Sequence, residues 1–199
     1  MFWLSKIVDE LVARVPDGEI TVSSGVSPSG TYHLGTLREV LTAEAVYREL
    51  KLRGRDARHI HVVDDLDPFR KVPAGVPADF EQYLGKPLCD VPAPDGSERS
   101  YASYYLQDLL GAAKGLGLDM EIVRAHEKYR SGFFTDAIEK ALGNIEGIRK
   151  ILEDVSGRQL DKYWSPVQDI EEGYLKNRRV LSLNNDKKTI QYEDKTGQK

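Results

Sequence analysis

The segment Ser24-Gly25-Val26-Ser27-Pro28-Ser29-Gly30-Thr31-Tyr32-His33-Leu34-Gly35-Thr36 lies between a short apolar run and a long stretch with helical spacing of its apolar residues. Residues 19–23 are predicted to form a strand, and residues 35–53 are predicted to form a helix. The segment is therefore a turn at a helix N-terminus, where backbone N–H groups and the positive end of the helix dipole attract phosphate. Three glycines in it let a ligand approach the backbone closely: Gly25, Gly30 and Gly35. This pattern predicts a nucleotide-binding site.

A second strand is predicted over residues 57–63, and carboxylates follow it directly. The strand–helix–strand order predicts an α/β fold in which a right-handed crossover joins parallel strands. The carboxylates are those of Asp64, Asp65 and Asp67. We expect them at the carboxyl end of the sheet, where open α/β sheets bind ligands, and a bound cation would relieve their mutual repulsion. In the alternative interpretation, Arg70 and Lys71 neutralise them in a surface loop.

The turn and the acidic block both resemble known signatures. His33-Leu34-Gly35-Thr36 resembles the His-x-Gly-His/Asn element of class I aminoacyl-tRNA synthetases. The run Asp64-Asp65-Leu66-Asp67-Pro68-Phe69-Arg70-Lys71-Val72-Pro73, followed by similar stretches at 83–88, 91–92 and 100–102, looks like the class I lysyl-tRNA synthetases. The likeness extends from about Val22 to the end of the chain. It implies a Rossmann-like parallel sheet of the nucleotidylyl transferase type, with a peripheral β insertion at the C-terminal end.

The resemblance implies ATP-dependent activation of lysine and its attachment to tRNA(Lys), with Mg²⁺ arriving on ATP and no zinc bound by the protein. His33 and Thr36 are the implied catalytic residues, since the family element donates to phosphate oxygens. Thr36 departs from the family's usual asparagine or histidine, and it keeps one short donor with less reach. ATP is expected to bind Pro28, Ser29, Gly30, His33, Gly35 and Thr36. In the alternative interpretation, His33 only caps the helix or packs locally.

The same resemblance implies a lysine site. The acidic block is also similar to the Asp-Asp-Thr-Asn stretch of the glutaminyl enzymes, whose first aspartate holds the α-ammonium group. Asp64 is therefore assigned to that group, and Asp65 is the second candidate. Gly25 and Ser27 match positions that border the amino-acid pocket in the family, although both also serve to form the turn. Tyr101 matches a position near the pocket and the incoming RNA end, whereas an aromatic residue on a helix is more often part of the core.

Composition narrows the class of protein. The 199 residues are 40% hydrophobic and 30% charged, and no apolar run approaches the ~18 residues that would span a bilayer, so no membrane partner is expected. A single cysteine, Cys89, excludes an internal disulfide and a multi-cysteine zinc site, and it favours a cytoplasmic protein. The net charge of −4 argues against non-specific nucleic-acid binding. Residues 173–199 nevertheless carry a net +4, which either faces RNA or belongs to a solvated hairpin.

The remaining pattern predicts further elements. Helices are predicted at 3–15, 101–115 and 135–157, and a strand at 119–123. Thr135 is the expected N-cap of the last helix, and Gly157 is its expected stop. His59 and His61 are expected on one face of their strand, but no third ligand supports a metal site. Residues 67–99 are rich in proline and glycine, which predicts a long ordered excursion from the strand end.

After Trp164 the character of the sequence changes to β. A hairpin is predicted from strands at 180–183 and 189–192, with turns at 184–187 and 194–197. We therefore expect residues 1–163 to be the N-terminal half of a catalytic domain and residues 164–199 to begin a β-rich connecting insertion.

Class I synthetases complete their site with a second half-domain that carries a Lys-Met-Ser-Lys-Ser-like loop, and no such sequence occurs here. The chain therefore resembles the N-terminal part of a longer enzyme whose C-terminal half is missing. Two other interpretations stay open. One is a degenerate synthetase fragment that binds RNA or nucleotide without catalysis. The other is a small nucleotidyltransferase with a related His-x-Gly-His motif, although such enzymes carry a later Ser/Thr-rich loop ending in arginine, which is not found here.

Overall fold

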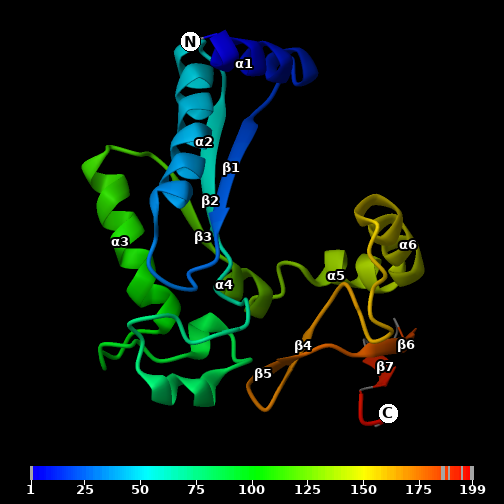
Figure 1. Cartoon of the computed structure of the whole chain (residues 1–199). Coiled ribbons are helices and arrows are strands. Elements are labelled where there is room, and N and C mark those ends of the chain that lie inside the picture. Colours follow the sequence, from blue (N-terminus) through cyan, green and yellow to red (C-terminus); the bar gives the residue numbers. More distant parts are fainter. Residues whose placement is uncertain (1, 185–186, 188, 194, 198–199) are drawn as a thin grey trace. The chain divides into compact units, whose positions relative to one another are not determined.

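The computed structural model describes residues 2–184, 187, 189–193 and 195–197. The chain divides into two compact units, Met1–Glu127 and Lys128–Lys199. The first unit contains a parallel sheet and the helices that connect its strands (Figure 1). The second unit contains, among the described residues, helices followed by antiparallel strands.

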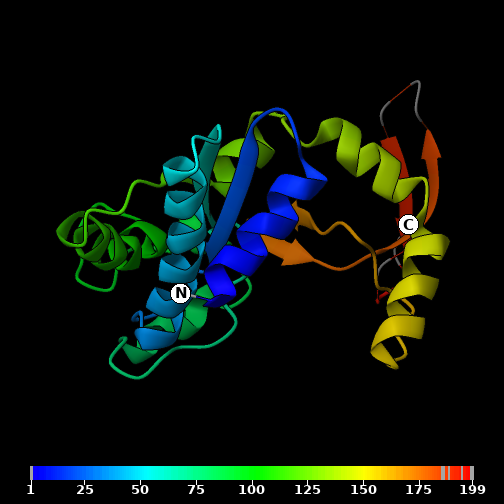
Figure 2. The same ribbon diagram turned by 90° about the horizontal axis from the view of Figure 1, so that it is seen from above.

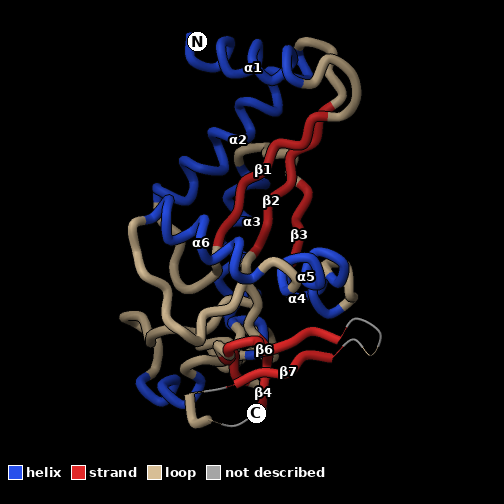
Figure 3. The backbone as a smooth tube through the Cα atoms, turned by 90° about the vertical axis from the view of Figure 1, so that its right-hand side faces the viewer, coloured by secondary structure: helices blue, strands red, loops and turns tan. Residues whose placement is uncertain are grey.

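The first unit is built on parallel strands that lie side by side (Figure 3): β1 (Ile20–Val26), β2 (Ala57–Val63) and β3 (Glu121–Arg124). Their order in the sheet is β1-β2-β3. Helix α2 (Leu34–Leu52) connects β1 to β2, and helix α3 (Tyr101–Gly115) precedes β3. This arrangement confirms the predicted α/β class and its Rossmann-like parallel sheet. β3 begins slightly later than the strand predicted at 119–123.

One face of the sheet is covered by α2 and α3. Because side chains alternate along a strand, one set of residues shares this face. Its buried members are Ile20, Ser24, Ala57, His59, His61 and Val63. Val63 packs with Val40 of α2 and with Leu106 and Leu109 of α3. Burial of each such aliphatic side chain contributes about 1.5–3 kcal/mol to stability.

Helix α1 (Phe2–Arg14) lies at the amino edge of the sheet, at the end opposite the carboxyl ends of the strands (Figure 1). It packs against α2 (Figure 2), and Val8 is buried in a cluster with Ile20, Val46 and Leu50. The helix confirms the prediction at 3–15. Its packing is that of a scaffold element, because it lies away from the edge where the turn and the aspartates are found.

Residues 67–99 extend beyond the carboxyl ends of β1 and β2 (Figure 1). They include the 3-10 helices η1 (Ala78–Tyr83) and η2 (Leu88–Asp90). Phe69 and Gly85 tie the excursion together, because Phe69 N donates to Lys86 O at 2.7 Å and Gly85 N donates to Phe69 O at 2.9 Å. Its buried side chains form a cluster with the start of α3: Phe69, Phe80, Leu88, Val91, Tyr101, Ala102 and Tyr105.

The second unit begins with helices whose bounds differ from the prediction. The single helix predicted at 135–157 is wrong, since the structure has α5 (Thr135–Leu142) and α6 (Ile145–Ser156). Gly143 and Asn144, both poor helix formers, separate them. Thr135 is not the N-cap; Phe134 holds that position, and Thr135 Oγ1 donates to Gly132 O at 2.8 Å. Gly157 does end α6, with a left-handed φ of 66°.

The antiparallel structure predicted after Trp164 is confirmed. Strands β4 (Asp169–Glu171) and β5 (Tyr174–Lys176) form one pair, and β6 (Arg179–Asn184) and β7 (Thr189–Glu193) form another. No described strand of this unit pairs with the parallel sheet. The turns predicted at 184–187 and 194–197 lie partly outside the described residues.

Part of the basic character of this segment is used inside the unit. Arg178 is buried, lies 2.5 Å from Glu171 and 3.3 Å from Asp169, and stacks 4.0 Å from the ring centroid of Tyr192. Over the stretch that the structure describes, no helix has the length and apolarity that crossing a bilayer requires.

Candidate functional site

His33 stands at the N-terminus of α2 and caps it. Its Nδ1 accepts a hydrogen bond from Gly35 N at 3.0 Å. Because Nδ1 accepts, the neutral ring carries its proton on Nε2, and that nitrogen is a donor on the far side of the exposed ring. The capping interpretation and the phosphate-donor interpretation therefore use different nitrogens of one ring.

Gly35 allows this arrangement. A Cβ atom at position 35 would lie 2.8 Å from Cε1 and 2.9 Å from Nδ1 of His33, so the ring would have to move. Thr36, the other predicted catalytic residue, is half-buried, and its backbone N–H donates to His33 O at 3.0 Å. The first turn of α2 thus presents one imidazole donor in a fixed direction.

The turn before α2 is held by packing from outside it. Pro28 is buried and Ser29 is exposed, and Ser29 O accepts a hydrogen bond from the Tyr101 hydroxyl at 3.1 Å. Tyr101 is fully buried among aromatic side chains, and burial raises its pKa. It is both a core residue and a direct support of the turn. The half-buried Gly30 faces Pro73 of the excursion, because a Cβ added at position 30 would lie 3.7 Å from Pro73 Cγ.

Gly25 and Ser27 lie where β1 runs into the turn, and both are half-buried. A Cβ at Gly25 would lie 3.2 Å from the carbonyl oxygen of Val62, which is closer than most side chains are found. Gly25 N donates to Glu39 Oε1 at 2.9 Å. Glu39 was not predicted as part of the site, because a glutamate on an exposed helix face carries no local signal of such a contact.

Asp64 lies at the carboxyl end of β2 and is exposed. Its backbone N–H donates to Val26 O at 2.8 Å, which brings it beside the end of β1. Desolvation, and then the charges of Asp67 and Asp65, raise the pKa of its carboxyl group. A carboxylate in this position gains from an approaching cation, because the cation removes the repulsion that its neighbours impose.

Asp65 is fully buried and is bound from two sides. Oδ2 lies 2.5 Å from Arg124 Nε and 2.6 Å from His126 Nδ1, and Oδ1 accepts from His126 N at 2.9 Å. Cys89 N donates to Asp65 O at 2.8 Å. The two adjacent aspartates therefore differ in environment: Asp64 is exposed, whereas Asp65 is buried and binds the last residue of β3, Arg124, and His126 beyond it.

Arg124 and His126 were missed by sequence reasoning. Arg124 is the last residue of β3, and His126 lies at the start of α4 (Ala125–Arg130), a short helix that was not predicted. A signal was present, since polar residues that directly follow a strand were the reason for selecting Asp64. The strand is predicted at 119–123, and neither of the polar residues that follow it, Arg124 and His126, is among the predicted site residues.

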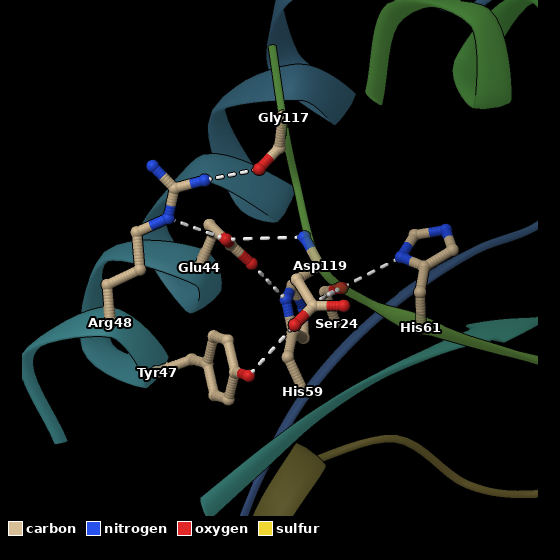
Figure 4. Close-up of polar contacts among 8 residues, drawn as sticks. All are labelled: Ser24, Glu44, Tyr47, Arg48, His59, His61, Gly117 and Asp119. Atoms are coloured by element: carbon tan, nitrogen blue, oxygen red, sulfur yellow. Dashed lines mark hydrogen bonds and ion pairs between the residues drawn. The ribbon is translucent and has the colours of Figure 1, made fainter. Parts of the chain in front are cut away.

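A buried series of hydrogen-bonded side chains includes Ser24, the residue that precedes Gly25 (Figure 4). Ser24 Oγ lies 2.9 Å from His59 Nε2 and 2.8 Å from His61 Nδ1, and His59 Nδ1 lies 2.9 Å from Glu44 Oε2. All four residues are buried. Since a carboxylate only accepts, His59 carries a proton on Nδ1. The chain ties β1, β2 and α2 together and confirms that the two histidines share a face.

Two kinds of ligand-binding group lie at the carboxyl edge of the sheet. A helix N-terminus with an imidazole donor suits phosphate oxygens, and an exposed carboxylate beside other acids suits an ammonium group. Among the residues that the structure describes, no group of three or more His, Cys, Asp or Glu side chains is arranged to hold a metal ion.

Comparison with known proteins gives a consistent result. The family model described as tRNA synthetases class I (K) matches residues 1–199. Lysine–tRNA ligase 1 of Methanosarcina acetivorans is 38% identical over 194 residues, which are 96% of this chain and 36% of that protein. The lysine–tRNA ligase of Methanococcus maripaludis is 36% identical over 199 residues, which are 99% of this chain and 37% of that protein.

The lysine–tRNA ligase of Archaeoglobus fulgidus is 35% identical over 195 residues, which are 97% of this chain and 39% of that protein. The chain thus spans little more than a third of the length of these curated relatives. The family match extends over the whole sequence, including the turn, the acidic block and the hairpins, so the chain belongs to the class I (K) tRNA synthetases.

Proposed function

We propose that this chain supplies the N-terminal part of a class I lysyl-tRNA synthetase, which activates lysine with ATP and transfers it to tRNA(Lys). One observation carries the proposal: the helix N-terminus capped by His33 and the exposed Asp64 lie at the same edge of the sheet. ATP and an amino acid must meet in this way for adenylation. The names of the relatives support lysine as the amino acid.

In the proposed reaction, a carboxylate oxygen of lysine attacks the α-phosphorus of ATP. A new P–O bond forms, the bond to the β-phosphate oxygen breaks, and pyrophosphate leaves with its Mg²⁺. A hydroxyl of the terminal tRNA ribose then attacks the lysyl carbonyl and releases AMP. The protein contributes mainly positioning and stabilisation of negative charge.

The ATP site is proposed to comprise Pro28, Ser29, Gly30, His33, Gly35 and Thr36. Nε2 of His33 is the proposed donor to phosphate oxygens, supported by the contact of Nδ1 with Gly35 N. The lysine site is proposed to comprise Gly25, Ser27, Asp64, Asp65 and Tyr101. Asp64 takes the α-ammonium group, whereas Asp65 and Tyr101 act from beneath, through the hydrogen bonds they make to their neighbours.

The remaining parts of the site are proposed to lie in a C-terminal half outside this sequence, including a loop with lysines that act on the transferring phosphates. Residues 1–163 would then be the first half of the catalytic domain, and 164–199 the start of a connecting insertion. A cytoplasmic location follows from this function. Groups that act mainly in the transition state affect rate more than binding. The chain alone is therefore expected to bind ATP and lysine weakly and to aminoacylate slightly or not at all.

Exchange of pyrophosphate into ATP, measured with each amino acid in turn, tests the proposal on a longer protein that includes the C-terminal half. Lysine-dependent exchange that requires His33 supports it. Exchange with no amino acid, driven by another acceptor, favours the small nucleotidyltransferase. For the 199-residue chain, calorimetry with ATP and with lysine gives the second test, and RNA binding without either ligand favours the degenerate binding module.

A further inference from the structure

His126 is a side chain at the edge of the sheet that the proposed reaction has not yet used. We propose that Nε2 of His126 accepts a hydrogen bond from the side-chain ammonium group of lysine, so that His126 and Asp64 together select an amino acid with two ammonium groups. This inference rests on the proposed function. It adds a residue to the amino-acid site and a reason for specificity.

The orientation of His126 is fixed by a buried carboxylate. Asp65 is fully buried, and it accepts from His126 twice, from the backbone N–H at 2.9 Å and from Nδ1 at 2.6 Å. The backbone contact fixes the position of the residue against the carboxylate, and the Nδ1 contact sets the direction of the ring. The carboxylate also sets the tautomer, because the nitrogen that faces it must carry a proton.

The other ring nitrogen follows from this geometry. With its proton on Nδ1, a neutral imidazole has a lone pair on Nε2, at the opposite side of the ring from Asp65. The side chain of His126 is 19% exposed, so it is neither enclosed in the core nor free in solvent. A fixed acceptor in such a position suits a donor that arrives from solution, and an ammonium group is a donor with three hydrogens.

Arg124 completes the arrangement. Its Nε lies 2.5 Å from Asp65 Oδ2, and its Nη2 donates to Ser103 Oγ at 3.2 Å. The guanidinium group supplies the positive charge that the buried carboxylate requires. His126 is therefore not needed as the cation of this pair and is available as an acceptor.

Strand register brings His126 and Asp64 to the same edge. Val63 at the end of β2 is the Cα partner of Arg124 at the end of β3, so the residues after each strand leave the sheet at the same level. Asp64 is bonded to the β1 side through Val26 O, whereas His126 follows β3 on the other side of β2. Lysine carries ammonium groups at both ends of a flexible aliphatic stem, which suits acceptors on two sides of one strand end.

The test is the variant His126→Asn in the 199-residue chain. The asparagine amide nitrogen replaces Nδ1 as a donor to Asp65, but no group replaces Nε2. We expect lysine affinity to fall about tenfold by calorimetry, the scale of one hydrogen bond to a charged group, with ATP affinity unchanged. The control is His33→Asn, which should lower the affinity for ATP and leave the affinity for lysine unchanged. Equal lysine affinity of wild type and His126→Asn would overturn the inference while leaving the proposed function intact.

Nitrogen NMR of the labelled histidine rings gives a readout that a purely structural role would not move. Saturating lysine should shift the Nε2 resonance of His126 and leave its Nδ1 resonance in place. 6-Aminohexanoate, which lacks the α-ammonium group, should produce a similar shift. A shift with norleucine, which lacks the side-chain ammonium, but not with 6-aminohexanoate would overturn the assignment. Failure of the wild-type chain to bind lysine at all would refute the proposed function and this inference together.

Discussion

The hydroxyl oxygen of Ser24 lies 2.8 Å from Nδ1 of His61, near the end of β1 that leads into the proposed ATP-binding turn. Both residues are buried, and His61 Nε2 has no hydrogen-bond partner among the described residues. A buried, neutral imidazole with one unmet nitrogen is costly to protonate. The stability of the sheet is thereby coupled to pH at a point next to the proposed site.

Stability is expected to fall as pH falls through the range in which unfolded histidine titrates. Burial, and then the neighbouring His59, lower the pKa of His61 to about 4, whereas Glu39 opposes the shift. The unfolded state therefore binds a proton from about pH 6.5 downward and the folded state resists it. The contribution of His61 is fully present above pH 6.5 and is lost progressively toward pH 4, to a total of about 3 kcal/mol. Urea unfolding of wild type and His61→Leu between pH 7 and pH 4 checks this, and parallel curves for the two proteins would contradict it.

The two tyrosines near the turn are expected to respond oppositely to loss of their hydroxyl groups. The Tyr32 hydroxyl is buried with no hydrogen-bond partner among the described residues, and burial raises its pKa against the effect of Arg124. Tyr32→Phe should be neutral or stabilising by about 1 kcal/mol, since it removes an unsatisfied polar group. Tyr101→Phe removes the bond to Ser29 O and should destabilise by about 1 kcal/mol. Thermal unfolding of both variants provides the comparison, and a loss of stability in Tyr32→Phe would show that its hydroxyl has a partner in solution.

Lysine binding is expected to depend on the ionisation of Asp64. Its raised pKa means that the carboxylate is lost at a higher pH than for an ordinary aspartate, so lysine affinity should decline as pH falls, before it reaches about 3.9. Asp64→Asn should weaken lysine binding by about 1.5–3 kcal/mol, remove that part of the pH dependence and leave ATP affinity largely unchanged. Calorimetric titrations of lysine and ATP at several pH values measure all three effects. Equal losses for the two ligands would contradict the proposed place of Asp64 in the lysine site.

Local signals in the sequence were sufficient for the turn, whereas contacts between distant residues were not predictable. The strand, the glycine-rich turn and α2 follow from the spacing of apolar residues and from His33 and Gly35 within a few positions. The role of Asp65 depends on His126, which lies far along the chain and meets it only because β3 pairs with β2. The helix predicted at 135–157 shows the opposite error. Apolar periodicity was followed across Gly143, where the local signal for a break was present.

The position of the His33 ring is expected to depend on the absence of a side chain at Gly35. His33→Ala should weaken ATP binding by about 1–3 kcal/mol, the scale of a charge-assisted hydrogen bond to phosphate. Gly35→Ala should also weaken ATP binding although the imidazole is retained, because a Cβ at position 35 would lie 2.8 Å from His33 Cε1 and displace the ring.

The matched control for that substitution is Gly111→Ala in α3, where a Cβ meets no atom within 4 Å. Alanine there should leave ATP affinity unchanged and add about 0.4–1 kcal/mol of stability, as in other helical positions without strain. ATP titrations by calorimetry, with unfolding curves for each variant, separate the two effects. If Gly35→Ala binds ATP as tightly as wild type while His33→Ala does not, the ring acts from a position other than the one seen at the start of α2. If neither variant changes ATP affinity, His33 is not part of the ATP site and the proposed role of its Nε2 is wrong.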